Sequence, residues 1–202
     1  MTDFNFCFKG NRTYVHGSDM FNSVNKYLRS NFGQAFSHVD FMSINHQTSN
    51  NLKGEILNAD QHDPSRQYIT ICKFSLSGEK KVLCLYERGA AVKCRYEYDE
   101  ESVVKNGQIS LEQKTITLNN ETSYSPIEVI IALNKKLVQN LFSAERGKWL
   151  FTKLLLKRAL PTSSLGLYSL VFKQNLGSRL TSSSIGIADK NYGDIYFSLT
   201  KG

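Results

Sequence analysis

His16 and Asp19 stand three positions apart in the segment YVHGSDMFN, where a helix is predicted to begin. A neutral imidazole exchanges protons near neutral pH, and a neighbouring carboxylate can hold its ring in one tautomer. Such a pair is suited to general acid–base catalysis. Glu128 takes the place of Asp19 in a similar segment later in the chain. We therefore predict His16, Asp19 and Glu128 as catalytic residues, and His16 with Glu128 as the favoured pair.

The same residues also have a purely structural interpretation. His16 could cap or cover the start of the helix, and both carboxylates could simply stabilise the positive ends of two helix dipoles. Ser125 stands where the second segment would need a histidine, so at most one of two such sites can use histidine chemistry.

Tyr14 and Asn22 flank this region and are predicted as substrate-binding residues, because each can hydrogen-bond a substrate carbonyl. His62 lies between two aspartates in DQHDP, but a polar turn with proline explains that segment, and we predict no metal ion and no cofactor. The chain has no G-x-S-x-G motif and no phosphate-loop spacing of glycines. Serine hydrolase chemistry and nucleotide hydrolysis are therefore excluded.

Two helices must position these residues. The first follows Ser18 and Asp19, which are predicted as its cap and first-turn carboxylate, and its apolar side chains recur at helical spacing up to Phe32. The second begins at Ser125 with Pro126 in its first turn and Glu128 closing a capping box. Its start is apolar on nearly every side, which indicates a buried helix.

The two helices belong to similar segments, Asn11 to Phe32 and Asn120 to Leu141, with six identities in 22 positions. A second similarity links Tyr68–Gly78 with Tyr168–Ser178 in the same order. Collinear similarities favour an internal duplication. With the acidic segment DEESVVKNG as the seam, we predict one repeat over residues 1–104 and another over 105–202.

Short segments rich in β-branched and aromatic residues surround the helices and predict strands. They are FNFCF, VDFMSI, QYITICKFSL, KVLCLYE, VKCRYEY, QISLEQKTITL, LYSLVF and DIYFSL. GKWLFTKLLLKRAL is ambiguous: its position after the second helix favours a long strand, whereas its apolar spacing also suits a basic amphipathic helix. We predict a strand.

A strand, a long apolar helix and an antiparallel sheet, present twice in about 200 residues, resemble the double hot-dog family. YVHGSDMFN is similar to the pre-helix segment of hot-dog thioesterases and dehydratases, where an acidic residue and a histidine or asparagine cluster near the helix start. The D-x-x-G-H-V-N-N order of common thioesterases and the H-F-P segment of fatty-acid dehydratases are both absent.

The resemblance implies an α+β fold of two tandem hot-dog-like repeats, each an antiparallel sheet wrapped around a long buried helix. It implies a protein that handles acyl thioesters as a 3-hydroxyacyl dehydratase or thioesterase of fatty-acid or polyketide metabolism. The acyl group would be carried by acyl carrier protein or coenzyme A, and the chain would be a monomeric pseudo-dimer or a homodimer. A non-catalytic shell that binds an acyl group is the alternative within this family.

The net charge of +7 is concentrated, because residues 146–188 contain seven basic and no acidic side chains. A field of one sign attracts a partner of the opposite charge. Acyl carrier proteins are acidic, and we predict a docking surface formed by Arg146, Lys148, Lys153, Lys157 and Arg158. The rival interpretation is a nucleic-acid surface, with stacking on the interleaved Trp149, Phe151, Tyr168 and Phe172.

The four cysteines, Cys7, Cys72, Cys84 and Cys94, lie among apolar residues without a C-x-x-C pair and are predicted as reduced, buried thiols. The N-terminal segment lacks the features of a signal peptide, and no apolar run reaches the length of a membrane span. We predict a cytoplasmic protein.

Overall fold

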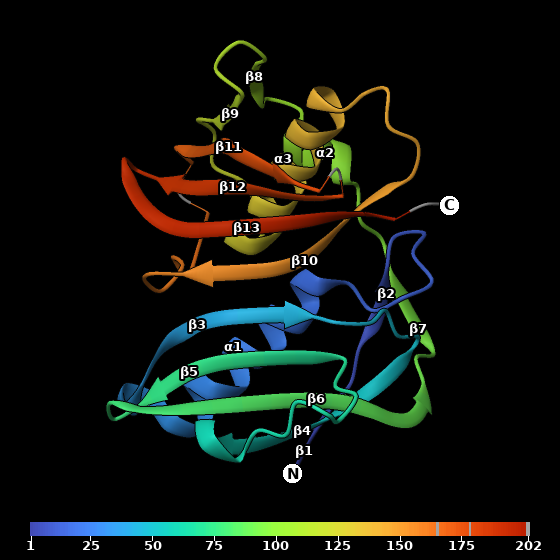
Figure 1. The fold of residues 1–202 in the computed structure, drawn as a ribbon, viewed down its shortest axis with the longest axis vertical. Helices are drawn as coiled ribbons and strands as arrows, with labels where there is room; N and C mark the ends of the chain where they lie inside the picture. Colours follow the sequence, from blue (N-terminus) through green and yellow to red (C-terminus); the bar gives the residue numbers. More distant parts are fainter. Residues whose placement is uncertain (165, 178, 201–202) are drawn as a thin grey trace. The chain divides into compact units, whose positions relative to one another are not determined.

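The computed structural model describes residues 1–164, 166–177 and 179–200. The chain divides into two compact units, Met1–Tyr98 and Asp99–Gly202 (Figure 1). The division falls at the start of the acidic segment 99–107. Within each unit, neighbouring strands of the main sheet are antiparallel and one 16-residue helix packs on the sheet. An antiparallel sheet with few helices agrees with the predicted fold class and is consistent with a hot-dog fold.

The N-terminal unit packs helix α1, Gly17–Phe32, along strand β3 (Figure 1). The helix buries one stripe, formed by Met20, Phe21, Val24 and Leu28, and ends at Gly33, whose φ of 51° suits only a residue without a side chain. The main sheet has the order β1-β4-β6-β5-β3. The bounds of these strands are Thr2–Phe4, Asn50–Asn58, Glu79–Ala91, Thr70–Leu76 and Phe36–Ile44. Two short 3-10 turns, Gly33–Ala35 and Ala59–Gln61, complete the unit.

A second, two-stranded sheet in this unit corrects the prediction for the cysteines. Strand β2, Cys7–Lys9, runs parallel to β7, Cys94–Tyr96, and a disulfide joins Cys7 to Cys94. These two residues are therefore not thiols, because the strand pairing places them opposite each other across 87 residues of sequence. Cys72 and Cys84 are buried free thiols, as predicted.

The C-terminal unit packs helix α3, Pro126–Leu141, on its sheet and beside the short helix α2, Glu100–Val104. Its sheet has the order β10-β13-β12-β11-β9-β8. The bounds of these strands are Lys148–Leu156, Lys190–Thr200, Leu180–Ile187, Tyr168–Leu176, Thr115–Leu118 and Gln108–Ser110. The ambiguous segment after the helix is strand β10, which confirms the strand prediction. Its Trp149, Phe151, Leu154 and Leu156 are buried at strand spacing.

The two units agree at their helices and differ in their sheets. α1 and α3 correspond residue for residue in the alignment of the two similar segments. The difference lies in the four strands that follow each helix. In the N-terminal unit the first of them, β3, pairs with the third, β5. In the C-terminal unit the first, β10, pairs with the fourth, β13. The proposed match of Tyr68–Gly78 with Tyr168–Ser178 is therefore wrong, since β5 and β11 occupy different places in their sheets.

Candidate functional site

Five polar side chains gather around the first turn of α1, and we call them the α1 N-terminal network. They come from β2, from the residue before the helix, from the helix itself and from β7. The members are Lys9, His16, Ser18, Asp19 and Tyr96. All lie within the N-terminal unit, so one packed unit sets their geometry.

His16 is the N-cap of α1, the position predicted for Ser18. Its backbone is extended, with φ −78° and ψ 142°, which is the geometry of a residue just outside a helix. Its Nδ1 accepts from the backbone N–H of Ser18 at 3.4 Å and lies 2.7 Å from Ser18 Oγ. The ring is 7 % exposed. When both Ser18 groups donate to Nδ1, the neutral imidazole carries its proton on Nε2.

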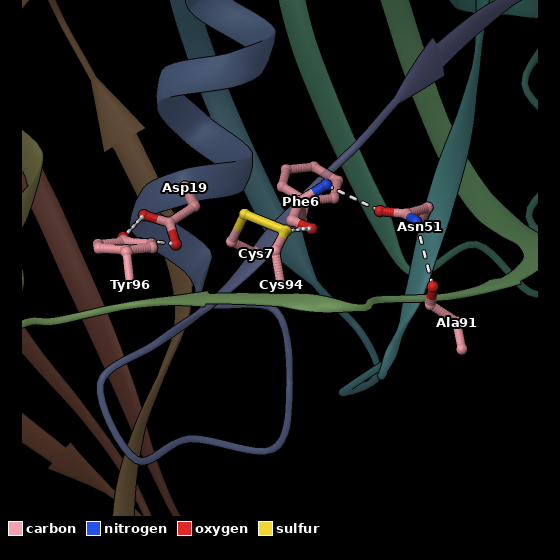
Figure 2. Close-up of a disulfide and its surroundings, with 7 residues drawn as sticks. All are labelled: Phe6, Cys7, Asp19, Asn51, Ala91, Cys94 and Tyr96. Carbon is pink, nitrogen blue, oxygen red and sulfur yellow. Dashed lines mark hydrogen bonds between the residues drawn. A yellow bond between two sulfur atoms is a disulfide. The ribbon is translucent and has the colours of Figure 1, made fainter.

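Asp19 lies in the first turn and gathers three donors. Its carboxylate is 3.4 Å from Lys9 Nζ and 3.2 Å from Ser18 Oγ, and the Tyr96 hydroxyl lies 2.9 Å from each of its oxygens (Figure 2). It does not contact the His16 ring directly. The predicted orientation of the imidazole by this carboxylate therefore passes through the Ser18 hydroxyl, which is fully buried between them.

Lys9 is fully buried, although it ends a short strand near the N-terminus. Its ammonium donates to Ser18 Oγ at 3.0 Å and lies 4.1 Å from the centre of the Tyr98 ring. A buried charge is tolerated only when it is paired and hydrogen-bonded. Asp19 supplies the charge and the Tyr98 ring a cation–π contact, so Lys9, Asp19 and the aromatic residues of segment 94–98 form one electrostatic unit.

Glu128 occupies the matching turn of α3 in the C-terminal unit. Its Oε2 accepts from the backbone N–H of Ser125 at 2.8 Å and from Ser125 Oγ at 2.7 Å. This is the predicted capping box, and it confirms Ser125 as the N-cap. The capping role of Glu128 is thus observed, while its pairing with His16 stays a prediction.

Tyr14 and Asn22 lie on either side of this turn. Tyr14 is half-buried in the chain that leads into α1, and Asn22 is half-buried one turn after Asp19. Their role in binding a substrate stays a prediction.

The predicted basic surface lies in and next to β10. Arg146, Lys148, Lys157 and Arg158 are exposed, whereas Lys153 is half-buried with its ammonium 5.1 Å from the centre of the Tyr196 ring. Of the aromatic residues proposed for nucleic-acid stacking, Trp149, Phe151 and Tyr168 are buried and Phe172 packs on Phe142. Trp149, Phe151 and Tyr168 are core residues of a strand-forming sequence, so the stacking interpretation is wrong for these three, whereas Phe172 is half-buried.

Sequence reasoning missed Lys9 and Tyr96. Lys9 directly follows the run FNFCF and looks like a lysine at an exposed strand end. Tyr96 reaches Asp19 across 77 positions of sequence, and no local spacing indicates that contact. The one usable indication was that Lys9 and Tyr96 follow Cys7 and Cys94 by the same two residues, which becomes informative only when those cysteines are paired.

Other candidate sites are few in the part of the chain that the structure describes. No group of three His, Cys, Asp or Glu side chains there could hold a metal ion. Among the same residues, no helix is both long and apolar enough to cross a membrane. A groove of about 230 Å³ lies on the β11–β12 hairpin, and it is lined by none of the predicted site residues.

Comparison with known proteins gives fold-level likenesses alone. No family model matches the chain, and no curated protein matches it. Among solved structures, a tesB protein of Mycobacterium avium subspecies paratuberculosis covers 92% of this chain and 86% of its own, with 8% identity and a TM-score of 0.45. A fusion DH domain covers 94% and 80%, with 12% identity and a TM-score of 0.46. A bifunctional dehydratase-cyclase domain of ambruticin biosynthesis covers 93% and 83%, with 8% identity and a TM-score of 0.47. Scores and identities this low say nothing about activity.

Proposed function

We propose that this protein acts on acyl thioesters, as a 3-hydroxyacyl dehydratase or a thioesterase, with the acyl group carried by acyl carrier protein or coenzyme A. The observation that carries the proposal is the α1 N-terminal network, in which a histidine at a helix start is linked through Ser18 to a carboxylate. Fatty-acid or polyketide metabolism is the setting in which such substrates occur.

The network supports both proton-transfer roles of His16. In the imidazolium both ring nitrogens carry a proton, and the ring acts as a general acid by giving up the proton on Nε2. With Nδ1 donating to Ser18 Oγ, and Ser18 donating to Asp19, Nε2 is unprotonated and acts as a general base. The change between these states is the gain or loss of one proton at Nε2, while Nδ1–H keeps its 2.7 Å contact with Ser18 Oγ and Ser18 keeps its 3.2 Å contact with the carboxylate of Asp19.

In dehydration, a base removes the proton from C2 of the 3-hydroxyacyl group and an acid protonates the departing 3-hydroxyl, which leaves as water. His16 supplies one of these groups and Glu128 the other. In hydrolysis, His16 instead activates the attacking water. In both reactions, negative charge develops on the thioester oxygen, where the positive end of a helix dipole stabilises it. Tyr14 and Asn22 orient that carbonyl.

The doubled architecture is part of the proposal. Residues 1–104 and 105–202 form two hot-dog-like repeats, in a monomeric pseudo-dimer or a homodimer. The residue-for-residue match of α1 with α3 supports this duplication. The different strand orders then mean that one repeat has exchanged the places of two strands since the duplication.

The test separates the capping role of His16 from its chemistry. In His16→Asn the amide oxygen still caps α1, because asparagine is among the best N-cap residues, but the imidazole is lost. We expect turnover of a 3-hydroxyacyl or acyl thioester to fall by about 10²- to 10⁴-fold with little change in melting temperature. The matched control is His46→Asn, since His46 is exposed in the loop after β3.

Unchanged turnover in His16→Asn rejects the catalytic assignment. If the unaltered protein binds an acyl-coenzyme A by calorimetry yet does not turn it over, the non-catalytic shell is the correct account.

A further inference from the structure

Strands β2 and β7, which the disulfide joins, also contain two members of the α1 N-terminal network, Lys9 and Tyr96. In the β2–β7 ladder Cys7 stands opposite Cys94, and Lys9 stands opposite Tyr96. The covalent bond at one end of this three-residue ladder therefore fixes the register of the pair at the other end. Figure 2 shows the disulfide beside the Tyr96–Asp19 contact.

Strand β7 is short and exposed. All three of its residues are exposed, and Tyr96 itself is 39 % exposed. A two-stranded sheet is marginal in water without further support. Other contacts also hold this strand, among them a hydrogen bond from the Gly10 N–H to the Tyr96 carbonyl and those from Arg95 to the carbonyls of Gly10 and Arg12. The bond between the cysteines adds a covalent tie two residues from Tyr96, whose hydroxyl contacts Asp19.

The disulfide is also open to attack. Cys94 is exposed and Cys7 is half-buried, whereas the two free thiols, Cys72 and Cys84, have no exposed surface. Reactivity in thiol–disulfide exchange depends on access to the sulfur. Cys94, the exposed partner, is therefore the side from which we expect a dithiol reductant to approach the bond.

We propose that the Cys7–Cys94 disulfide is a redox latch on the candidate site, and that Tyr96 is the positioning residue through which it acts. The inference rests on the proposed function for its effect on turnover. A thiolate of a dithiol reductant attacks Cys94 Sγ, and the S–S bond breaks with Cys7 leaving as a thiolate that takes up a proton. The second thiol of the reductant then displaces Cys94 as a thiol. Two electrons pass to the cysteines, and the reductant ends as a disulfide.

The activity test compares oxidised and reduced protein with and without the Tyr96 hydroxyl. Tyr96→Phe keeps the ring near Lys9 but removes the group that contacts Asp19. We expect kcat to fall about tenfold with KM unchanged, as for other residues that hold a catalytic group in place. Reduction with dithiothreitol should lower kcat of the unaltered protein by a similar factor. Reduction of Tyr96→Phe should then add almost nothing, because both changes remove one contact.

A structural readout keeps the latch testable if the thioesterase or dehydratase assignment fails. The ¹³Cγ resonance of Asp19 reports the hydrogen bonds to its carboxylate. We expect reduction to shift this resonance to the position that it has in oxidised Tyr96→Phe. Tyr27→Phe is the matched control, because Tyr27 lies eight residues after Asp19 on α1 and its hydroxyl accepts from Thr2, and the resonance should stay in place.

Thiol labelling confirms which bond has opened. Iodoacetamide should add two groups after reduction, at Cys7 and Cys94, and none before it. Cys72 and Cys84 stay unlabelled because they are buried, and burial raises the pKa of the Cys84 thiol to about 11. A reduced protein in which the Asp19 resonance does not move overturns the latch. An Asp19 shift without any effect on turnover keeps the latch and rejects only the proposed function.

Discussion

Lys9 places a positive charge where no water reaches it, and this decides what substitutions in the network do to stability. Taking an ammonium out of water is costly, and removing its counter-charge leaves that cost uncompensated. Replacing the charged group by a hydrophobic side chain of similar volume removes the cost instead. Loss of the Asp19 carboxylate should therefore destabilise the protein more than loss of the Lys9 ammonium.

We expect Asp19→Asn to lower the free energy of unfolding by about 3–5 kcal/mol, because it removes the carboxylate that lies 3.4 Å from a buried ammonium. Lys9→Met should cost less than half as much, and the double variant should recover part of the loss. Urea denaturation measures all three. The control is Asp40→Asn, whose partner Lys80 is 66% exposed, and it should cost at most about 1 kcal/mol. Equal losses for Asp19→Asn and Lys9→Met would contradict the idea that Lys9 is charged in the folded protein.

For single residues, the sequence indicated which side chains could have a role better than it indicated which side chains they contact. His16 was identified from its place before a helix, and both of its possible roles, cap and proton carrier, were foreseen. Lys9, Ser18 and Tyr96 were not placed correctly, since their roles depend on contacts between segments that are far apart in the chain. The disulfide was missed for the same reason.

At the scale of elements, the helices were predictable because their determinants are local. Apolar spacing, Pro126 and the capping box of Ser125 and Glu128 all lie within one segment. Strands β4 and β12 were missed. β4 contains Gly54 among polar residues, and in β12 three consecutive serines interrupt the β-branched residues, so neither shows the continuous β-branched or aromatic run typical of strands. Their strand conformation comes from pairing with neighbours on both sides.

Glu128→Ala tests how much the capping box of Glu128 and Ser125 stabilises α3. Loss of the capping box should lower the free energy of unfolding by about 1 kcal/mol, which corresponds to about 2–4 °C in melting temperature for a protein of this size. Glu121→Ala, an exposed residue upstream of α3, should change it little. If Glu128 also transfers a proton, turnover will fall by about 10²-fold or more, far beyond what this loss of stability produces. A melting temperature that does not change would contradict the capping role.

At the scale of the whole molecule, the basic residues of segment 146–188 are the feature that would attract a charged partner at long range. The charge argument for an acidic carrier still holds, whereas three of the four residues proposed for nucleic-acid stacking are buried in the core. The cytoplasmic prediction also stays a prediction. Its argument from reduced cysteines now holds for Cys72 and Cys84 alone.

Charge reversal at two exposed positions tests the carrier. Lys148→Glu with Lys157→Glu should weaken association with acyl carrier protein and flatten its salt dependence, because screening acts over about 10 Å at 0.1 M salt. Lys153 is left unchanged, since its contact with Tyr196 would confuse a loss of charge with a loss of packing. The control reverses Lys93 and Lys105, which are exposed and lie outside segment 146–188. If the variant binds the carrier as before but loses affinity for single-stranded DNA, the nucleic-acid interpretation is correct.

The exchanged strand order has a consequence for how the chain is made. In the C-terminal unit β11, β12 and β13 pair in the order in which a ribosome would deliver them. In the N-terminal unit β3 and β4 emerge one after the other, but within that unit β3 pairs with β5, and β4 pairs with β1 and β6. During synthesis β3 therefore has no pairing strand from its own unit until the β5–β6 hairpin has been made, and that hairpin then lies between β3 and β4. The Cys7–Cys94 bond can form only after that, when β7 follows β6 out of the ribosome.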